Sequence, residues 1–366
     1  MKSKGLKMAG EVYRLLCEAM AKRGLEYRGM DIPEFYALVE ELFTPEEADV
    51  FLAIPRGYHF ASAVATEMGK REEEVAPILE AMANKGLCGA GKMGDTTFYA
   101  SLPFVPGIFD LQFMRGTSTK KDKRLAKLIH NYKAAVDATQ GPAEITFPTT
   151  RVIPVDWKIQ VGTTIHTYDQ VASYIEKYDP LAVSTCYCRH EAKLLDEKDD
   201  CGKPNEVCMQ FGMGAQFVID RSIGRKISKE EANDILRECE EAGLVHSTLN
   251  KQEIDWLCNC CKDHCVIIRK ALAQPKPGIA HNSGFQPVRN PELCKACEIC
   301  IERCPSSALT MGEDDVPKVD LDRCIGCGVC ASGCPEEAIT LVERPGVQVP
   351  PLDQEALQEA MKASQA

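Results

Sequence analysis

Residues 294–305 read CKACEICIERCP, and residues 324–335 read CIGCGVCASGCP. Both stretches have the spacing C-x2-C-x2-C-x3-C-P. Three thiols at this interval can surround one face of a four-iron cluster, and the fourth, after a longer gap, reaches the other cluster of a pair. Zinc sites more often use paired C-x2-C knuckles that close one tetrahedron. The repeated run of four cysteines therefore favours two iron–sulfur clusters over zinc.

This repeat resembles the bacterial two-cluster ferredoxin family over about residues 286–343. The segment between the two motifs fits the hairpin of that family, and AITLVE fits its closing strand. The resemblance implies a ferredoxin-like domain with two [4Fe-4S] clusters. One implied ligand set is Cys294, Cys297, Cys300 and Cys334. The other implied set is Cys324, Cys327, Cys330 and Cys304.

Cysteine is the informative residue in the rest of the chain as well. The 366 residues include 19 cysteines, far above ordinary usage, and a chain of this length predicts two to four compact units. The N-terminus lacks the apolar core and cleavage site of a secretory signal, and no segment reads as a membrane span. We therefore expect a cytoplasmic protein whose thiols bind metals or clusters and do not form disulfides.

The acidic charge gathers towards the C-terminus. The chain has a net charge of −11, and residues 286–366 contain 14 acidic but only 7 basic side chains. Such a field repels nucleic acid and attracts a basic protein surface. The expected partners are redox proteins, such as a flavoprotein or an oxidoreductase complex.

Residues 1–140 are predicted to form a winged-helix-like docking domain. The order is a helix in HFASAVATEMG, a helix in REEEVAPILEAMANKG, and two short strands around glycine-rich turns. The second helix begins with Glu72, Glu73 and Glu74, where a DNA-reading helix would meet phosphates. These carboxylates oppose the attraction on which DNA binding depends, so we favour protein docking.

Residues 141–273 are predicted to form a central α/β cysteine-rich domain, which makes the whole chain a multidomain α+β protein. LAVSTCYCR predicts a short buried strand that ends at the first cysteines. Four cysteines form each of two groups along this region: Cys186, Cys188, Cys201 and Cys208, followed by Cys258, Cys260, Cys261 and Cys265. Four thiols suit one cubane cluster or one structural zinc ion.

Several metal arrangements remain open for these eight cysteines. Two further cubane clusters are favoured, ahead of one cluster with spare thiols and of zinc or a mixed site. A Rieske centre that uses His190 and His264 is less favoured, because it would leave most of the thiols without a role. Arg189 is expected to donate to cluster sulfur. Cys17, Cys88 and Cys239 occur singly and are predicted to be core residues.

The predicted function is electron transfer through two C-terminal clusters and one or two central ones. Residues 274–285 read as a linker and residues 344–366 as a tail. The middle region also looks similar to multi-cluster iron–sulfur proteins of anaerobic bacteria, which implies a role in anaerobic metabolism. The alternative is a redox-sensing transcription regulator that uses the winged helix. A stand-alone enzyme is less favoured, since no dinucleotide or phosphate-binding motif is present.

Overall fold

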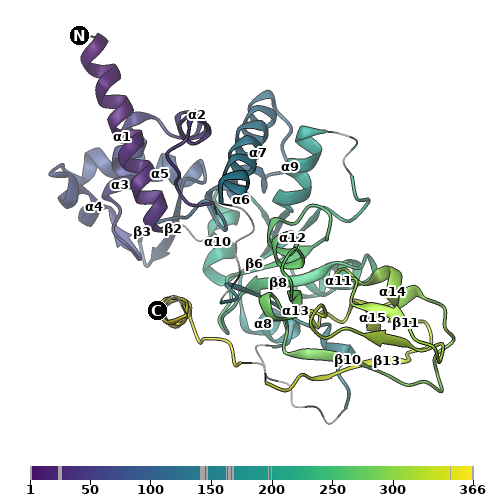
Figure 1. The fold of residues 1–366 in the computed structure, drawn as a ribbon. Coiled ribbons are helices and arrows are strands. Elements are labelled where there is room, and N and C mark those ends of the chain that lie inside the picture. Colours follow the sequence, from purple (N-terminus) through teal and green to yellow (C-terminus); the bar gives the residue numbers. More distant parts are fainter. Residues whose placement is uncertain are drawn as a thin grey trace. The chain divides into compact units, whose positions relative to one another are not determined.

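A computed structural model describes residues 2–23, 27–140, 145, 147–161, 163, 166, 169–196, 198, 200–346 and 348–364 (Figure 1). The chain divides into two compact units. The first contains Met1–Gly141, His190–Asp199 and Gln216–Gly224. The second contains Pro142–Arg189, Asp200–Ala215 and Arg225–Ala366, so the central cysteines and the ferredoxin-like repeat share one unit.

The first unit is mainly helical. Its helices are α1 (Lys2–Arg23), α2 (Pro33–Leu42), α3 (Pro45–Ala53), α4 (Ala61–Met68), α5 (Glu72–Asn84), α6 (Ile108–Phe113) and α7 (Lys120–Gln140). Its strands β1 (His59–Phe60), β2 (Cys88–Met93) and β3 (Thr96–Ser101) form an antiparallel sheet of order β1-β3-β2. The elements α4, α5, β2 and β3 follow the order that the sequence predicts, and their identification as a winged helix stays a prediction.

An aromatic cluster holds the helices of the first unit together. Tyr132 of α7 is fully buried, with the ring centroids of Phe35 and Phe104 each 5.8 Å away and that of Phe109 6.4 Å away. Phe104 and Phe109 also stack on each other at 4.6 Å. Aromatic pairs in these edge and stacked geometries add stability beyond their buried area, so the cluster fixes α2, α6 and α7 against one another.

The acidic start of α5 has a local structural reason. Glu72, Glu73 and Glu74 form its first turn and are exposed. The side chain of Glu74 accepts a hydrogen bond from the backbone N–H of Arg71, the N-cap residue. Negative side chains are favourable at this end of a helix, because they face its unsatisfied N–H groups.

A six-stranded antiparallel sheet forms the centre of the second unit. Its strand order is β4-β8-β9-β6-β5-β7. The strands are β4 (Thr150–Val152), β5 (Leu181–Thr185), β6 (Glu206–Phe211), β7 (Arg225–Ile227), β8 (Val245–Leu249) and β9 (Trp256–Cys260). The helices of this unit are η1 (Asp156–Lys158), α8 (Val171–Lys177), α11 (Lys229–Glu241), α12 (Val266–Leu272) and α13 (Pro277–Ala280). Helices α9 (Tyr187–Leu195) and α10 (Gly212–Asp220) begin in the second unit, and their later residues belong to the first.

The pairing of these strands differs from the expected α/β arrangement. Within the described residues every pairing in the sheet is antiparallel. An α/β domain in the strict sense has parallel strands joined by helical crossovers, whereas an antiparallel sheet with helices is an α+β arrangement. The predicted buried strand at residues 181–185 is present as β5, and α9 begins two residues after it.

Two similar halves build the C-terminal part of the second unit. The first half is β10 (Phe285–Arg289), α14 (Ile299–Arg303) and β11 (Leu309–Met311). The second half is β12 (Pro317–Val319), α15 (Val329–Ser332) and β13 (Ile339–Glu343). Strand β10 pairs with β13, and β11 with β12, so each half supplies one strand to each two-stranded sheet. Helix α16 (Gln354–Ala363) follows.

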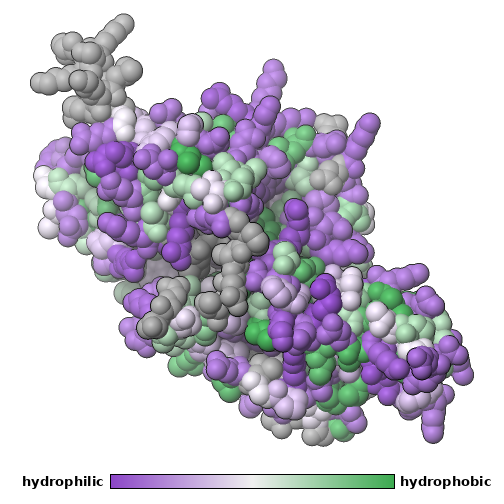
Figure 2. Space-filling model, in the orientation of Figure 1, coloured by the Kyte–Doolittle hydropathy of each residue, from purple (hydrophilic) through white to green (hydrophobic). Residues whose placement is uncertain are grey.

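The segment predicted as a linker contains regular structure. Helix α13 lies within residues 274–285, and its Pro277 and Ala280 are buried. On the face drawn in Figure 2, hydrophilic residues cover most of the described surface of each unit. None of the described helices combines the length and apolar character needed to cross a bilayer.

Candidate metal centres

The two cysteine loops of the C-terminal halves share one backbone geometry. Ala296 and Gly326, each two residues after the first cysteine of its motif, have φ of 52° and 69°. Glu298 and Gly328, each one residue after the second cysteine, have φ of 61° and 83°. These left-handed residues curl the chain so that successive N–H groups can face one concave site, an arrangement that suits an anionic group.

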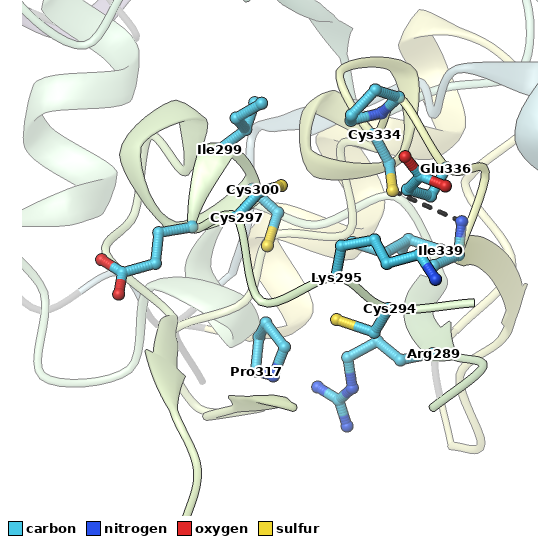
Figure 3. Close-up of a pocket in the computed structure, with 13 residues that line it drawn as sticks. Arg289, Cys294, Lys295, Cys297, Ile299, Cys300, Pro317, Cys334, Glu336 and Ile339 are labelled. Carbon is cyan, nitrogen blue, oxygen red and sulfur yellow. Dashed lines mark hydrogen bonds between the residues drawn. The ribbon is translucent and has the colours of Figure 1, made fainter. Parts of the chain in front are cut away.

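The first pocket draws its cysteines from both halves. Cys294, Cys297 and Cys300 of the first motif line it together with Cys334 of the second, and their thiols face the same space (Figure 3). The backbone N–H of Ala338 donates to Cys334 Sγ at 3.3 Å. Cys297 is exposed, so this pocket opens to solvent.

The second pocket repeats the arrangement in a more buried place. Cys324, Cys327 and Cys330 line it together with Cys304 of the first motif. The backbone N–H of Ala308 donates to Cys304 Sγ at 3.3 Å, matching the bond at the equivalent position of the other half. Burial, followed by the neighbouring thiols, raises the pKa of Cys330. A buried thiolate of this kind needs a compensating positive charge, which metal ions supply.

Comparison with known protein families bears directly on these two pockets. Residues 287–310 and 317–340 each match the 4Fe-4S binding domain family. The chain is an iron–sulfur protein with a C-terminal ferredoxin domain. No curated protein and no solved structure matches the chain.

Six of the eight central cysteines of this iron–sulfur protein form one connected group. We refer to them as the six-thiol group: Cys186, Cys188, Cys208, Cys258, Cys260 and Cys265. On one side of the group, the thiol of Cys188 hydrogen-bonds those of Cys186 and Cys265. Cys265 Sγ also lies 3.3 Å from Cys260 Sγ. Helices α9 and α12 therefore both begin beside this group.

Sheet pairing brings the other side of the six-thiol group together. Strand β6 pairs with β9 with Met209 opposite Leu257, which places Cys208 beside Cys258. Their thiols hydrogen-bond, and Cys258 in turn contacts Cys260 two residues along the strand. Alternate residues of a strand share a face, so the strand presents two thiols on one side of the sheet.

Arg189 places a buried positive charge beside these thiols. It is only 2% exposed, and its Nη1 donates to the Asn259 carbonyl at 3.1 Å. Among the described residues, its Nε and Nη2 have no oxygen or nitrogen acceptor. Burial alone would lower the pKa of Arg189, but the nearby thiols of Cys186, Cys261 and Cys260 raise it overall. Arg189 also hydrogen-bonds the thiol of Cys261, and a buried cation of this kind suits an anionic iron–sulfur cluster.

The two remaining central cysteines lie in a different place. Cys201 and Cys261 gather with His264, and the ligand atoms of these three residues all lie within 4.8 Å of one another. Cys261 packs into the hydrophobic cluster that includes Val183 and Leu257, with Cys201 and also Cys186 of the six-thiol group against it. The sequence grouping of four plus four cysteines therefore does not match the spatial grouping of six plus two.

His264 is a potential metal ligand that the preferred sequence interpretation omitted. The C-x2-H spacing between Cys261 and His264 indicates this ligand in the sequence, but the spacing was considered only for the Rieske centre. That alternative gains no support, because His190 belongs to the first unit and its Nε2 lies 2.7 Å from the Thr117 carbonyl oxygen. Cys17, Cys88 and Cys239 are buried in apolar surroundings, and burial raises the pKa of Cys88 to about 12.

Proposed function

We propose that this protein relays single electrons through three [4Fe-4S] clusters, two in the ferredoxin domain and one at the six-thiol group. When bound, a cluster supplies a centre that gains or loses one electron with little rearrangement. The observation that carries this proposal is that the six-thiol group and the second ferredoxin pocket share one buried hydrophobic cluster. Cys260, Cys265, Ile325 and Cys327 all belong to it.

The ferredoxin pockets provide two sets of four thiols. We assign Cys294, Cys297, Cys300 and Cys334 to one cluster. We assign Cys304, Cys324, Cys327 and Cys330 to the other. Cys300, Cys304, Cys330 and Cys334 pack into a shared apolar cluster, which supports close approach of the two centres.

The six-thiol group provides more than the four ligands that one cubane needs. Backbone and side-chain N–H groups also point at its sulfurs. Gln210 Nε2 donates to Cys208 Sγ at 3.2 Å, and the Ile268 N–H donates to Cys265 Sγ at 3.5 Å. Together with Arg189, these donors would stabilise the negative charge of a thiolate-bound cluster.

The solvent exposure of the cysteine ligands indicates the order in which electrons pass through the three clusters. The first ferredoxin pocket contains the exposed Cys297, whereas the thiols of the second are mostly buried. The six-thiol group contacts the second pocket through the hydrophobic cluster described above. We infer that electrons exchange with a partner at the Cys297 end and reach the central group by way of the Cys327 cluster.

The acidic surfaces of this protein are the proposed binding sites for a partner protein. We propose that the first unit is a winged-helix docking domain and that the partner is a redox protein with a basic surface. The exposed glutamates at the start of α5 support docking over transcription regulation. The association rate with such a partner should fall as ionic strength rises, whereas binding to DNA fragments at low salt would favour the regulator.

Metal content and spectroscopy test the three clusters. Anaerobically purified full-length protein should contain about twelve irons and about twelve acid-labile sulfides per chain. Replacing Cys188, Cys260 and Cys265 together by serine, which leaves three of the six thiols, should remove about four irons and one set of paramagnetic resonance signals on reduction. Cys239→Ala, a buried thiol outside both groups, should keep all of them. About eight irons per chain in the unaltered protein would mean that only the ferredoxin domain holds clusters, and would disprove the cluster at the six-thiol group.

A further inference from the structure

We infer that Cys201, Cys261 and His264 form a separate site for a single divalent cation, and that zinc is the ion that fits these donors. The site goes beyond electron transfer and does not depend on a cluster at the six-thiol group. Two thiolates and one imidazole are borderline-soft ligands, which zinc prefers to the oxygen donors that magnesium and calcium require.

The spacing of the three ligand atoms suits one ion. Cys261 Sγ lies 3.6 Å from His264 Nδ1, and all three ligand atoms lie within 4.8 Å of one another. Tetrahedral zinc, with bonds of about 2.3 Å to sulfur and about 2.0 Å to nitrogen, separates such a pair of ligands by about 3.5 Å. The three side chains can therefore bind one ion without a large movement of the chain.

The ferredoxin pockets provide an internal comparison. Within the described part of the chain, the group of Cys201, Cys261 and His264 is the only one in which three potential ligand atoms come this close together. The thiols of the two ferredoxin pockets do not, as expected for ligands that each bind a different iron of a cluster. The three-residue group therefore differs from the two ferredoxin pockets of the same molecule.

The surrounding backbone holds the ligands in a metal-binding arrangement. The C-x2-H segment turns so that the His264 N–H donates to Cys261 Sγ at 3.4 Å. The side chain of Asp200 accepts from the Gly202 N–H at 2.9 Å, which closes a turn around Cys201. Arg189 hydrogen-bonds the thiol of Cys261 and so helps to orient that ligand. Such outer contacts orient ligands and tune a bound metal.

Partial exposure makes the site accessible and leaves a coordination position open. Cys261 is buried, whereas Cys201 and His264 are half-exposed. Three protein ligands leave the fourth tetrahedral position of zinc to water or to a donor atom of a small molecule, as in catalytic zinc sites. Zinc undergoes no redox change, so the ion would act as a Lewis acid next to an electron-transfer centre.

Zinc and iron contents of full-length variants test the site. Protein produced with zinc in the medium and purified anaerobically should hold about one zinc per chain. His264→Ala and Cys201→Ser should lose that zinc and keep their iron and sulfide. His264→Cys should retain zinc, because a third thiolate is also a zinc ligand. The matched controls are His166→Ala, an exposed histidine of the same unit, and Cys239→Ala, and both should keep zinc and iron.

Cobalt substitution gives a readout that needs no mutation. Co²⁺ loaded into the unaltered protein in place of zinc should show thiolate-to-metal charge-transfer absorption. The inference would be wrong if the unaltered protein contained no zinc and showed no cobalt absorption band. It would also be wrong if His264→Ala lost iron, because His264 would then be a cluster ligand. About eight irons with one zinc would instead disprove only the central cluster.

Discussion

Cys260 and Cys261 follow each other in the chain, yet their side chains belong to two different buried clusters. Cys260 packs with Cys265 and Cys327, next to the ferredoxin domain. Cys261 packs with Val183 and Leu257 on the other side of the sheet. Because neighbouring residues at the end of a strand point to opposite faces, one peptide bond joins the proposed electron-transfer centre to the proposed zinc site.

The crossed ligand sets of the ferredoxin domain can be tested in pairs. Cys334→Ser should remove the same cluster as Cys300→Ser, although the two cysteines lie in different motifs, because both line the first pocket. Cys304→Ser should likewise remove the same cluster as Cys324→Ser, because both cysteines line the second pocket. Iron counts and resonance spectra of the four variants provide the measurement. If Cys334→Ser instead matched Cys324→Ser, each motif would hold its own cluster.

Replacing Arg189 should shift the potential of the central cluster. Reduction adds negative charge, and the buried guanidinium stabilises that charge, so Arg189→Gln should make the central potential more negative. A tenfold change in the reduction equilibrium corresponds to about 60 mV for one electron. A redox titration followed by paramagnetic resonance would measure the shift. Arg225→Gln, at an exposed salt bridge of the same unit, should leave the potential unchanged.

A buried ion pair in the first unit should make one variant sensitive to pH. Lys133 Nζ lies 2.5 Å from the carboxylate of Glu191, and both side chains are largely buried. Burial raises the pKa of Glu191, whereas Lys133 lowers it. Lys133→Met removes the opposing effect, so the pKa in the folded protein should rise further above that of the unfolded chain.

The sign of the pH dependence follows from that shift. At neutral pH, Lys133→Met leaves a buried charge unpaired and should destabilise α7 by roughly 3–5 kcal/mol. Stability should recover as the pH falls through the raised pKa of Glu191, because the folded state then binds a proton before the unfolded state does. Hydrogen exchange of α7 measures this, and Lys133→Met with Glu191→Leu should abolish the pH dependence. Equal destabilisation at every pH would contradict the prediction.

Gly326 should be essential for the second cluster loop. It has φ of 69°, and a Cβ atom there would lie 2.2 Å from the Phe285 carbonyl oxygen. Gly326→Ala should therefore reduce iron by about four per chain. Gly346→Ala is the matched control, because Gly346 has φ of 82° and open space around it. That change should bring only the backbone strain of about 1–2 kcal/mol and keep all iron.

The ferredoxin domain could be predicted from sequence because its signal is local. Its motif is complete within twelve residues and occurs twice, and the matching family confirms it. The buried strand before Cys186 was also predictable, because LAVS is apolar and short and matches β5.

The arrangement of the central cysteines could not be predicted in the same way. Cys208 meets Cys258 only because β6 pairs with β9 in one register, and neither strand encodes that register by itself. Cys201 lies between Cys188 and Cys208 in the chain, yet it lies with Cys261 in space. The ligand sets of the ferredoxin domain could be predicted, including the fourth cysteine from the other loop, because a repeated motif defines them, and the central cysteines have no such motif.

The two halves of the ferredoxin domain differ in how their loops meet the rest of the protein. Gly326 and Gly328 lie against Phe285, Val155 and Leu341, whereas the equivalent Ala296 is half-exposed and Glu298 is exposed. A docking partner would therefore displace water around the first centre while leaving the surroundings of the second unchanged. Formation of the complex would then change the free energy of electron transfer between the partner and the first cluster. The free energy of transfer between the second cluster and the central one would stay the same.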